Sequence, residues 1–137
     1  MLPEIQDEPK DMDKASRPKF LYLLKIRLPV PGVVSISHRI SGVFLFLAVP
    51  LYIFLLHISL RDPAGFDAAR SFLQMYPGRL VLLFSLWLLI HHLIAGVRFL
   101  LLDIGLGKDR PADRASSWLV LVTSLVALIT LAMWILT

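Results

Sequence analysis

Three long apolar runs constrain the fold more than any other feature of this sequence. They extend over Val43–Leu60, Leu80–Leu102 and Trp118–Leu136, and each approaches the roughly 20 residues that a helix needs to cross a bilayer core of about 30 Å. Of the 137 residues, 57% are hydrophobic and 18% are charged, whereas a soluble domain has about 45–50% apolar and about 25% charged residues. The sequence therefore predicts an all-α membrane protein. Its three transmembrane helices are expected at about 33–60, 79–103 and 116–137, within a single anchor domain, 1–137.

Shorter segments surround these runs. Residues 1–18 are polar and predict a mobile tail. The apolar stretch 20–32 is too short to span and predicts a segment that lies along the membrane interface. A short amphipathic helix is expected from Ala64 to Met75, and Pro50 should kink the first span. The stretch DIGLGKDRPADRASS, residues 103–117, predicts a turn-rich second loop.

Basic residues predict how the chain is oriented in the membrane. Nine Lys and Arg residues lie before the first span or in the second loop, against three in the first loop. Because segments rich in Lys and Arg stay in the cytoplasm, the N-terminus is expected in the cytoplasm and the C-terminus outside. The net charge of +4 is thus explained by topology rather than by nucleic-acid binding. The start of the chain resembles neither a signal peptide nor an organellar transit peptide, so a bacterial inner membrane is the expected location.

Two histidines and an arginine interrupt the second apolar run, where ionisable residues are costly and mark functional sites by default. His92 lies about 16 Å inside the cytoplasmic helix end and Arg98 about 7.5 Å inside, at about 1.5 Å per residue. Arg98 can therefore reach the interface or pair with an acidic ligand group. The depth of His92 fits two roles equally well: an interhelical hydrogen bond and the ligation of a metal or haem iron. Gly96, one turn away, leaves room for a flat macrocycle. His91 points about 100° away and is expected to make an interhelical hydrogen bond.

A second polar cluster opens the first span in the stretch SISHRISG, residues 35–42. On a helix Ser35 and Arg39 share a face, and His38 lies close by. A serine hydroxyl and a guanidinium can both donate to one carbonyl oxygen, and a quinone is a flat apolar ring with two such carbonyls. The alternative is topological, with His38 and Arg39 acting as a cytoplasmic anchor for the helix.

Together the two clusters resemble the signatures of a known family, the cytochrome b membrane-anchor subunit of succinate dehydrogenase, of the SdhC type. The stretch RPKFLYLLKIRLPVPGVVSISHRIS, residues 17–41, has an Arg-Pro, spaced apolar residues and Ser-x-x-His-Arg-x-Ser/Thr. The stretch HLIAGVRFLLLDIG, residues 92–105, has a His, three residues, Gly, an apolar residue, Arg and an Asp-x-Gly end. The likeness covers residues 17–105 by motif and the third span by architecture alone. Phe99 departs from it, since several members have a second His there.

The resemblance implies a haem site. His92 matches the axial ligand of the haem b iron, and a second membrane-anchor subunit supplies the other axial histidine. His38, Arg39 and Arg98 fall where contacts to the haem propionates are expected, and Gly96 falls in the haem pocket.

The resemblance also implies a quinone site and partner subunits. Ser35 and Arg39 match ubiquinone-binding residues. A flavoprotein subunit with FAD and an iron–sulfur subunit would deliver electrons from succinate, linking the tricarboxylic acid cycle to respiratory electron transport. The chain has no cysteine, so it cannot itself ligate an iron–sulfur cluster through thiolates, and no catalytic residue for succinate oxidation is expected in it. Two alternatives stay open: a fumarate reductase anchor, and a structural anchor with no redox role.

Overall fold

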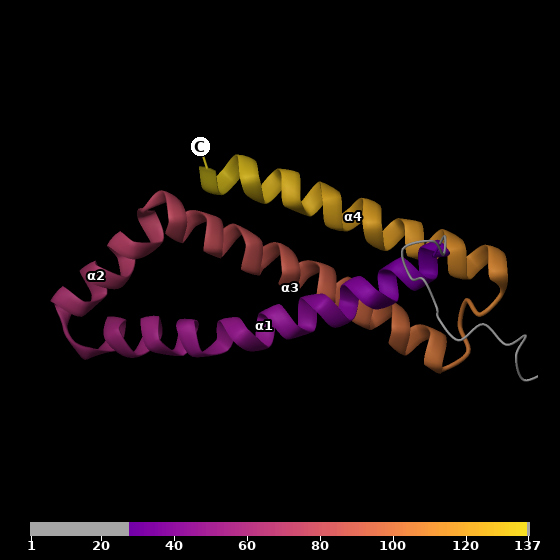
Figure 1. Ribbon diagram of the computed structural model, residues 1–137, viewed down its shortest axis with the longest axis horizontal. Helices are drawn as coiled ribbons and strands as arrows, with labels where there is room; N and C mark the ends of the chain where they lie inside the picture. Colours follow the sequence, from indigo (N-terminus) through magenta and orange to yellow (C-terminus); the bar gives the residue numbers. More distant parts are fainter. Residues whose placement is uncertain (1–27, 137) are drawn as a thin grey trace, which may run out of the picture.

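The computed structural model describes residues 28–136, which form four α-helices (Figure 1). The helices are α1 (Val30–Arg61), α2 (Pro63–Gln74), α3 (Tyr76–Asp103) and α4 (Arg110–Leu136). Three of them, α1, α3 and α4, are long and apolar enough to cross a membrane. The predicted all-α architecture with three spanning helices is confirmed. The expected tail, 1–18, and residues 20–27 of the expected interfacial segment lie outside the described residues.

The spanning helices begin earlier than the apolar runs indicated. Helix α1 starts at Val30 and not near 33, α3 at Tyr76 and not near 79, and α4 at Arg110 and not near 116. Hydropathy marks only the part of a helix that suits lipid, whereas polar or proline-bearing first turns extend beyond it. Proline belongs in such a first turn because its missing N–H would have no intrahelical partner there, and α1 and α3 both carry one.

Helix α2 confirms the expected short helix and shifts it by one residue at each end, from Ala64–Met75 to Pro63–Gln74. Pro50 lies inside α1, which continues as a single helix through it. In Figure 1 the α1 ribbon is bowed along its length. An interior proline removes one backbone hydrogen bond, and α1 accommodates that loss without ending.

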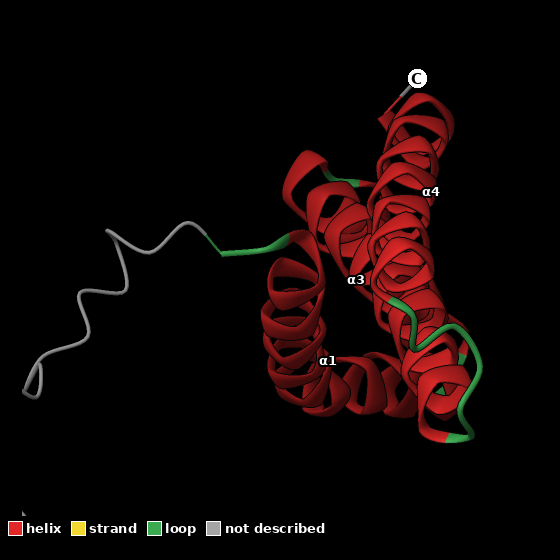
Figure 2. Cartoon of the chain, turned by 90° about the vertical axis from the view of Figure 1, so that its right-hand side faces the viewer, coloured by secondary structure: helices red, strands yellow, loops and turns green. Residues whose placement is uncertain are grey.

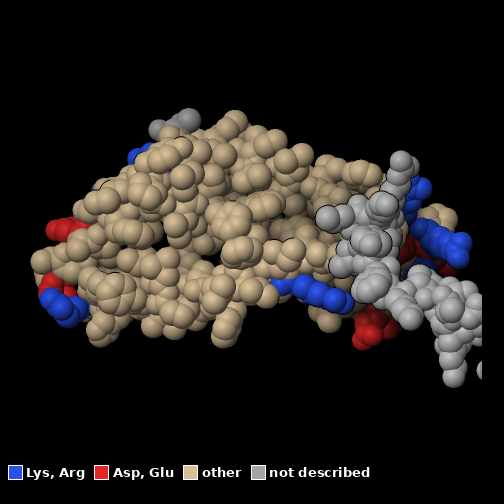
Figure 3. All heavy atoms as spheres, in the orientation of Figure 1, with Lys and Arg blue, Asp and Glu red and all other residues tan. Residues whose placement is uncertain are grey.

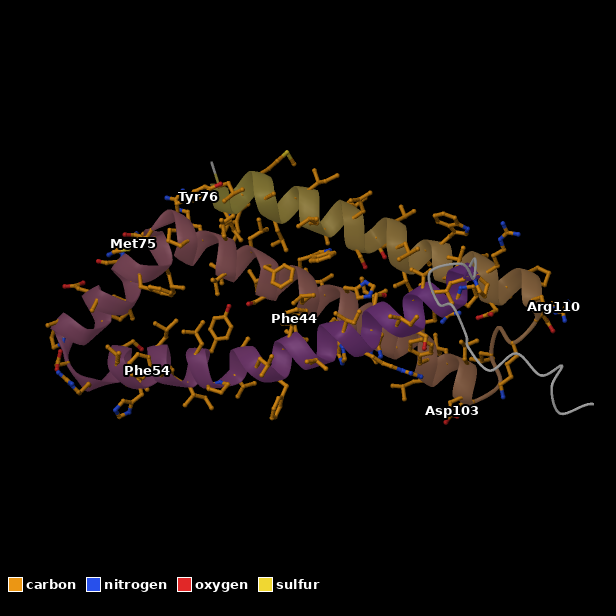
Figure 4. All side chains as sticks on the ribbon, in the orientation of Figure 1. Phe44, Phe54, Met75, Tyr76, Asp103 and Arg110 are labelled. Atoms are coloured by element: carbon orange, nitrogen blue, oxygen red, sulfur yellow. The ribbon has the colours of Figure 1, made fainter. Side chains whose placement is uncertain are left out.

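Helix α3 lies between α1 and α4 and contacts both (Figure 2). One small apolar residue from each spanning helix, Val34, Ala95 and Val120, forms the buried core where the three meet. Farther along, Phe44 of α1, labelled in Figure 4, meets Phe84 of α3 edge-on, with ring centroids 5.7 Å apart. Small residues allow close approach of helices in membranes, which explains why the core contains few large side chains.

Most large apolar side chains of the described chain face outward instead. Charged residues gather toward the two ends of the molecule, and a broad uncharged band separates them (Figure 3). A surface of this kind is suited to hydrocarbon or to a neighbouring subunit in the membrane, because lipid tails satisfy apolar side chains as well as a protein core does.

The corner between α1 and α2 is fixed by a capping carboxylate. Asp62 accepts a hydrogen bond from the Gly65 backbone N–H at 2.7 Å, which caps the first turn of α2. This bond, and secondarily the Arg61 side chain, holds the pKa of the Asp62 carboxyl below its usual range. A Cβ at Gly65 would collide with the backbone oxygen of Ile58, so the sharp corner requires glycine.

The turn between α3 and α4 is built on a glycine in the left-handed region. Gly105 has a φ of 95° and donates its N–H to the Leu102 carbonyl at 3.0 Å, while the Leu106 N–H donates to the Leu101 carbonyl at 2.9 Å. This pair of bonds ends a helix by satisfying its last carbonyls. The turn-rich loop predicted for residues 103–117 is therefore real but shorter, because α4 begins at Arg110.

Candidate functional site

Helices α1 and α3 meet at two histidines. The rings of His38 and His92 stack with centroids 4.0 Å apart and planes 15° apart. A glycine lies under each ring: a Cβ on Gly42 would lie 3.0 Å from His92 Cε1, and one on Gly96 would lie 3.4 Å from His38 Nε2. The space beside Gly96, which the sequence predicts for a flat macrocycle, thus holds the His38 imidazole in this structure.

The two ring nitrogens of His92 have different surroundings. Nδ1 lies 2.9 Å from the Ser41 hydroxyl and 3.1 Å from the His38 backbone oxygen. Nε2 has no hydrogen-bond partner among residues 28–136. Histidines that ligate metals typically engage their other nitrogen with a carbonyl or a similar group. The surroundings of the two His92 nitrogens therefore fit a histidine that would bind a haem iron through Nε2.

Ser35, His38 and Arg39 come from one stretch of α1 but face different surroundings. His38 is half-buried against α3, Ser35 is half-buried, and Arg39 is exposed. Ser35 and Arg39 are one helical turn apart and share a face, as the spacing predicted. The structure therefore brings His38 to His92 and leaves the guanidinium of Arg39 at the surface of the subunit.

Arg98 is buried, with 6% of its surface exposed, and it binds α4. Its Nη2 donates to the Asp113 carboxylate and, at 3.2 Å, to the Asp113 backbone oxygen, and its Nε donates to the Ser116 hydroxyl at 3.0 Å. Its buried Nη1 has no hydrogen-bond partner in the described part of the chain. The Arg98 guanidinium is therefore directed at the first turn of α4, where it forms an ion pair with Asp113.

This ion pair yields a stability prediction. We expect Asp113→Asn to lower the free energy of unfolding by about 3 kcal/mol, because removing one partner leaves a buried guanidinium without its counter-charge. The midpoint of thermal unfolding of the purified assembly in detergent measures the effect. Asp109→Asn, which changes an exposed carboxylate just before the start of α4, is the matched control. Equal midpoints for the two variants would show that the Arg98 pair contributes nothing to stability.

His91 makes the interhelical hydrogen bonds expected from the direction of its side chain on the helix. Its Nε2 lies 2.9 Å from the Ser37 hydroxyl of α1, and its Nδ1 lies 2.9 Å from the Ser124 hydroxyl of α4. The indole N–H of Trp87 donates to the Ser124 backbone oxygen at 3.0 Å. One imidazole therefore links all three spanning helices, and both of its nitrogens are occupied by serines.

The hydrogen-bond partners of His91, His92 and Arg98 were not predicted from the sequence. Ser124 interrupts the third apolar run, and Ser37 and Ser41 lie in the stretch 35–42 that opens the first span. Small hydroxyl residues within spans commonly bond across helices. That pattern was the available signal. The sequence signal for Asp113 as a partner of Arg98 was weaker, because an acid in the first turn of a helix is also favoured by the helix dipole.

The chain is similar to a described protein family and to several known proteins. Residues 13–131 match the family of succinate dehydrogenase/fumarate reductase transmembrane subunits. The succinate dehydrogenase cytochrome b556 subunit of Coxiella burnetii is 35% identical over 125 residues, which cover 88% of this chain and 98% of that protein. The subunit of the same name from Paracoccus denitrificans is 31% identical over 122 residues, covering 88% and 94%. The one from Rickettsia felis is 30% identical over 119 residues, covering 87% and 91%.

The match extends beyond the two stretches that carry the resemblance in sequence, and it includes the third span. It agrees with three helices that are long and apolar enough to span a membrane. The chain belongs to the family of succinate dehydrogenase/fumarate reductase transmembrane subunits, as a cytochrome b membrane anchor of the SdhC type.

Proposed function

We propose that this subunit binds haem b through His92 and helps to reduce ubiquinone with electrons from succinate. The proposal is based on the different surroundings of the two ring nitrogens of His92. Its Nδ1 is engaged by α1, while its Nε2 keeps no partner among the described residues. The name of the relatives, cytochrome b556 subunit, supports haem b as the group that this nitrogen binds.

The residues around His92 suit a haem that is shared between subunits. Haem b, when bound, supplies a site that takes up and gives back one electron at a time. His92 would hold the haem iron through Nε2, together with a histidine of a second membrane-anchor subunit. His38, Arg39 and the Nη1 of Arg98, which has no partner among the described residues, would offer N–H donors to the propionates, and Gly96 would line the haem pocket.

Ser35 and Arg39 bind the quinone. The Ser35 hydroxyl and the Arg39 guanidinium donate to a quinone carbonyl oxygen, and hydrogen bonds from a charged donor are about twice as strong as neutral ones. Ubiquinone takes up two electrons and two protons to become the quinol, and succinate gives up two of each to become fumarate. A flavoprotein subunit and an iron–sulfur subunit carry the electrons between them, at the cytoplasmic side of a bacterial inner membrane.

Purification of the complex through this subunit tests the proposal. The reduced-minus-oxidised visible spectrum should show a b-type haem with two histidine ligands, and the complex should reduce ubiquinone with succinate. A complex with no Soret band would overturn the haem assignment and favour a purely structural anchor. Faster turnover with menaquinol and fumarate would favour the fumarate reductase alternative, which the family description includes.

A further inference from the structure

Ser41 of α1 lies against His92 of α3. It is almost fully buried, with 1% of its surface exposed. Its hydroxyl donates to the His38 backbone oxygen at 2.7 Å and lies 2.9 Å from His92 Nδ1. The same His38 oxygen lies 3.1 Å from His92 Nδ1. The two oxygens therefore converge on one nitrogen of the ring.

This geometry determines which nitrogen carries the proton. A backbone carbonyl oxygen can only accept a hydrogen bond, and the Ser41 proton is already directed at that oxygen. Two lone pairs facing an unprotonated Nδ1 would repel it, so Nδ1 must carry the hydrogen and donate it. A neutral imidazole has a single N–H, and its lone pair is therefore on Nε2. The ring lies close over Gly42, where an added Cβ would come within 3.0 Å of His92 Cε1.

We propose that Ser41 is a positioning residue for His92: with the His38 carbonyl it holds the ring in the Nδ1–H tautomer, aims Nε2 at the iron and sets how strongly that nitrogen donates. The inference rests on the proposed function, because it concerns a haem held by His92. An N–H that donates to a good acceptor makes the imidazole a stronger base, and a more basic ligand stabilises ferric iron.

A purely local role for Ser41 has to be separated from this one. Serines inside helices often bond the carbonyl three or four residues earlier without further purpose. Ser37 offers the comparison, since it also donates to a carbonyl three residues back, that of Val34, at 3.1 Å. It too lies 2.9 Å from a histidine nitrogen, but the histidine is His91. The two serines are one turn apart on α1 and differ in which histidine they engage.

Three variants of the whole complex test the proposal: Ser41→Ala, Ser41→Thr and Ser37→Ala. We expect Ser41→Ala to shift the one-electron reduction equilibrium of the haem toward the ferrous form by up to tenfold, which is about 59 mV. Ser41→Thr keeps the hydroxyl and should stay close to the wild type, and Ser37→Ala should leave the potential unchanged. A redox titration of the Soret band measures all three, and haem per complex is determined alongside.

The outcomes separate cleanly. Loss of haem in Ser41→Ala alone would support the proposal as strongly as a shifted potential does. A wild-type potential and full haem content in Ser41→Ala would overturn it, and so would equal changes in Ser41→Ala and Ser37→Ala, because helix packing would then explain both. If the wild-type complex carried no haem that depends on His92, the proposed function itself would fail. If haem binding depends on His92 but the haem content and potential do not depend on Ser41, only the proposed role of Ser41 is refuted.

Discussion

Replacement of His92 by leucine is expected to remove haem b from the complex. Leucine is close in size but offers no lone pair, and the iron would lose one of its two axial ligands. Removing residues that merely support a metal ligand costs about tenfold to a hundredfold in affinity, so loss of the ligand itself should cost more. The pyridine haemochrome content per complex and the reduced-minus-oxidised spectrum measure the result.

His91→Leu is the matched control for this variant. It makes the same change one residue away, at a histidine whose nitrogens are both taken by Ser37 and Ser124. Its haem content and spectrum should stay close to those of the wild type, although the bridge between the three helices is lost. A full haem spectrum in His92→Leu, or its loss in His91→Leu alone, would contradict the assignment of the ligand.

Replacement of Arg39 by leucine is expected to lower quinone reduction by about tenfold to a hundredfold. This is the loss expected when a hydrogen bond from a charged donor, worth about 1.5–3 kcal/mol, disappears, at about 1.4 kcal/mol per factor of ten. Succinate oxidation with an artificial electron acceptor should be unchanged, because that reaction occurs in the partner subunits. The ratio of the two rates measures the effect independently of how much complex is assembled.

Two further variants sharpen this prediction. Arg70→Leu removes an exposed arginine of α2 and should leave the ratio of the two rates at its wild-type value. Ser35→Ala removes the other proposed donor and should lower the ratio in the same direction as Arg39→Leu. Normal quinone turnover in Arg39→Leu would remove Arg39 from the quinone site and leave the topological alternative for it.

The spanning helices were predictable because their signal is local. Each run of apolar residues has the composition and length of a span whatever its neighbours are, and α2 was recognisable from its own amphipathic pattern. The starts of α1 and α4 were not predictable to the residue, since Val30 and Arg110 lie in polar or proline-bearing stretches that hydropathy does not mark. The quinone and haem roles came from two short motifs, and they remain proposals.

The sequence by itself determined which side chains would be anomalous in a membrane and which directions they would take on their helix. That His91 and His92 would have different partners follows from the rotation of about 100° per residue in any helix. Only the tertiary structure decided which residues are their hydrogen-bond partners. Ser41 and His92 are 51 residues apart in the chain and Arg98 and Asp113 are 15 apart. Which of them meet depends on the depth and rotation at which α1, α3 and α4 pack, and packing is a sum over many small contacts that no single stretch of sequence contains.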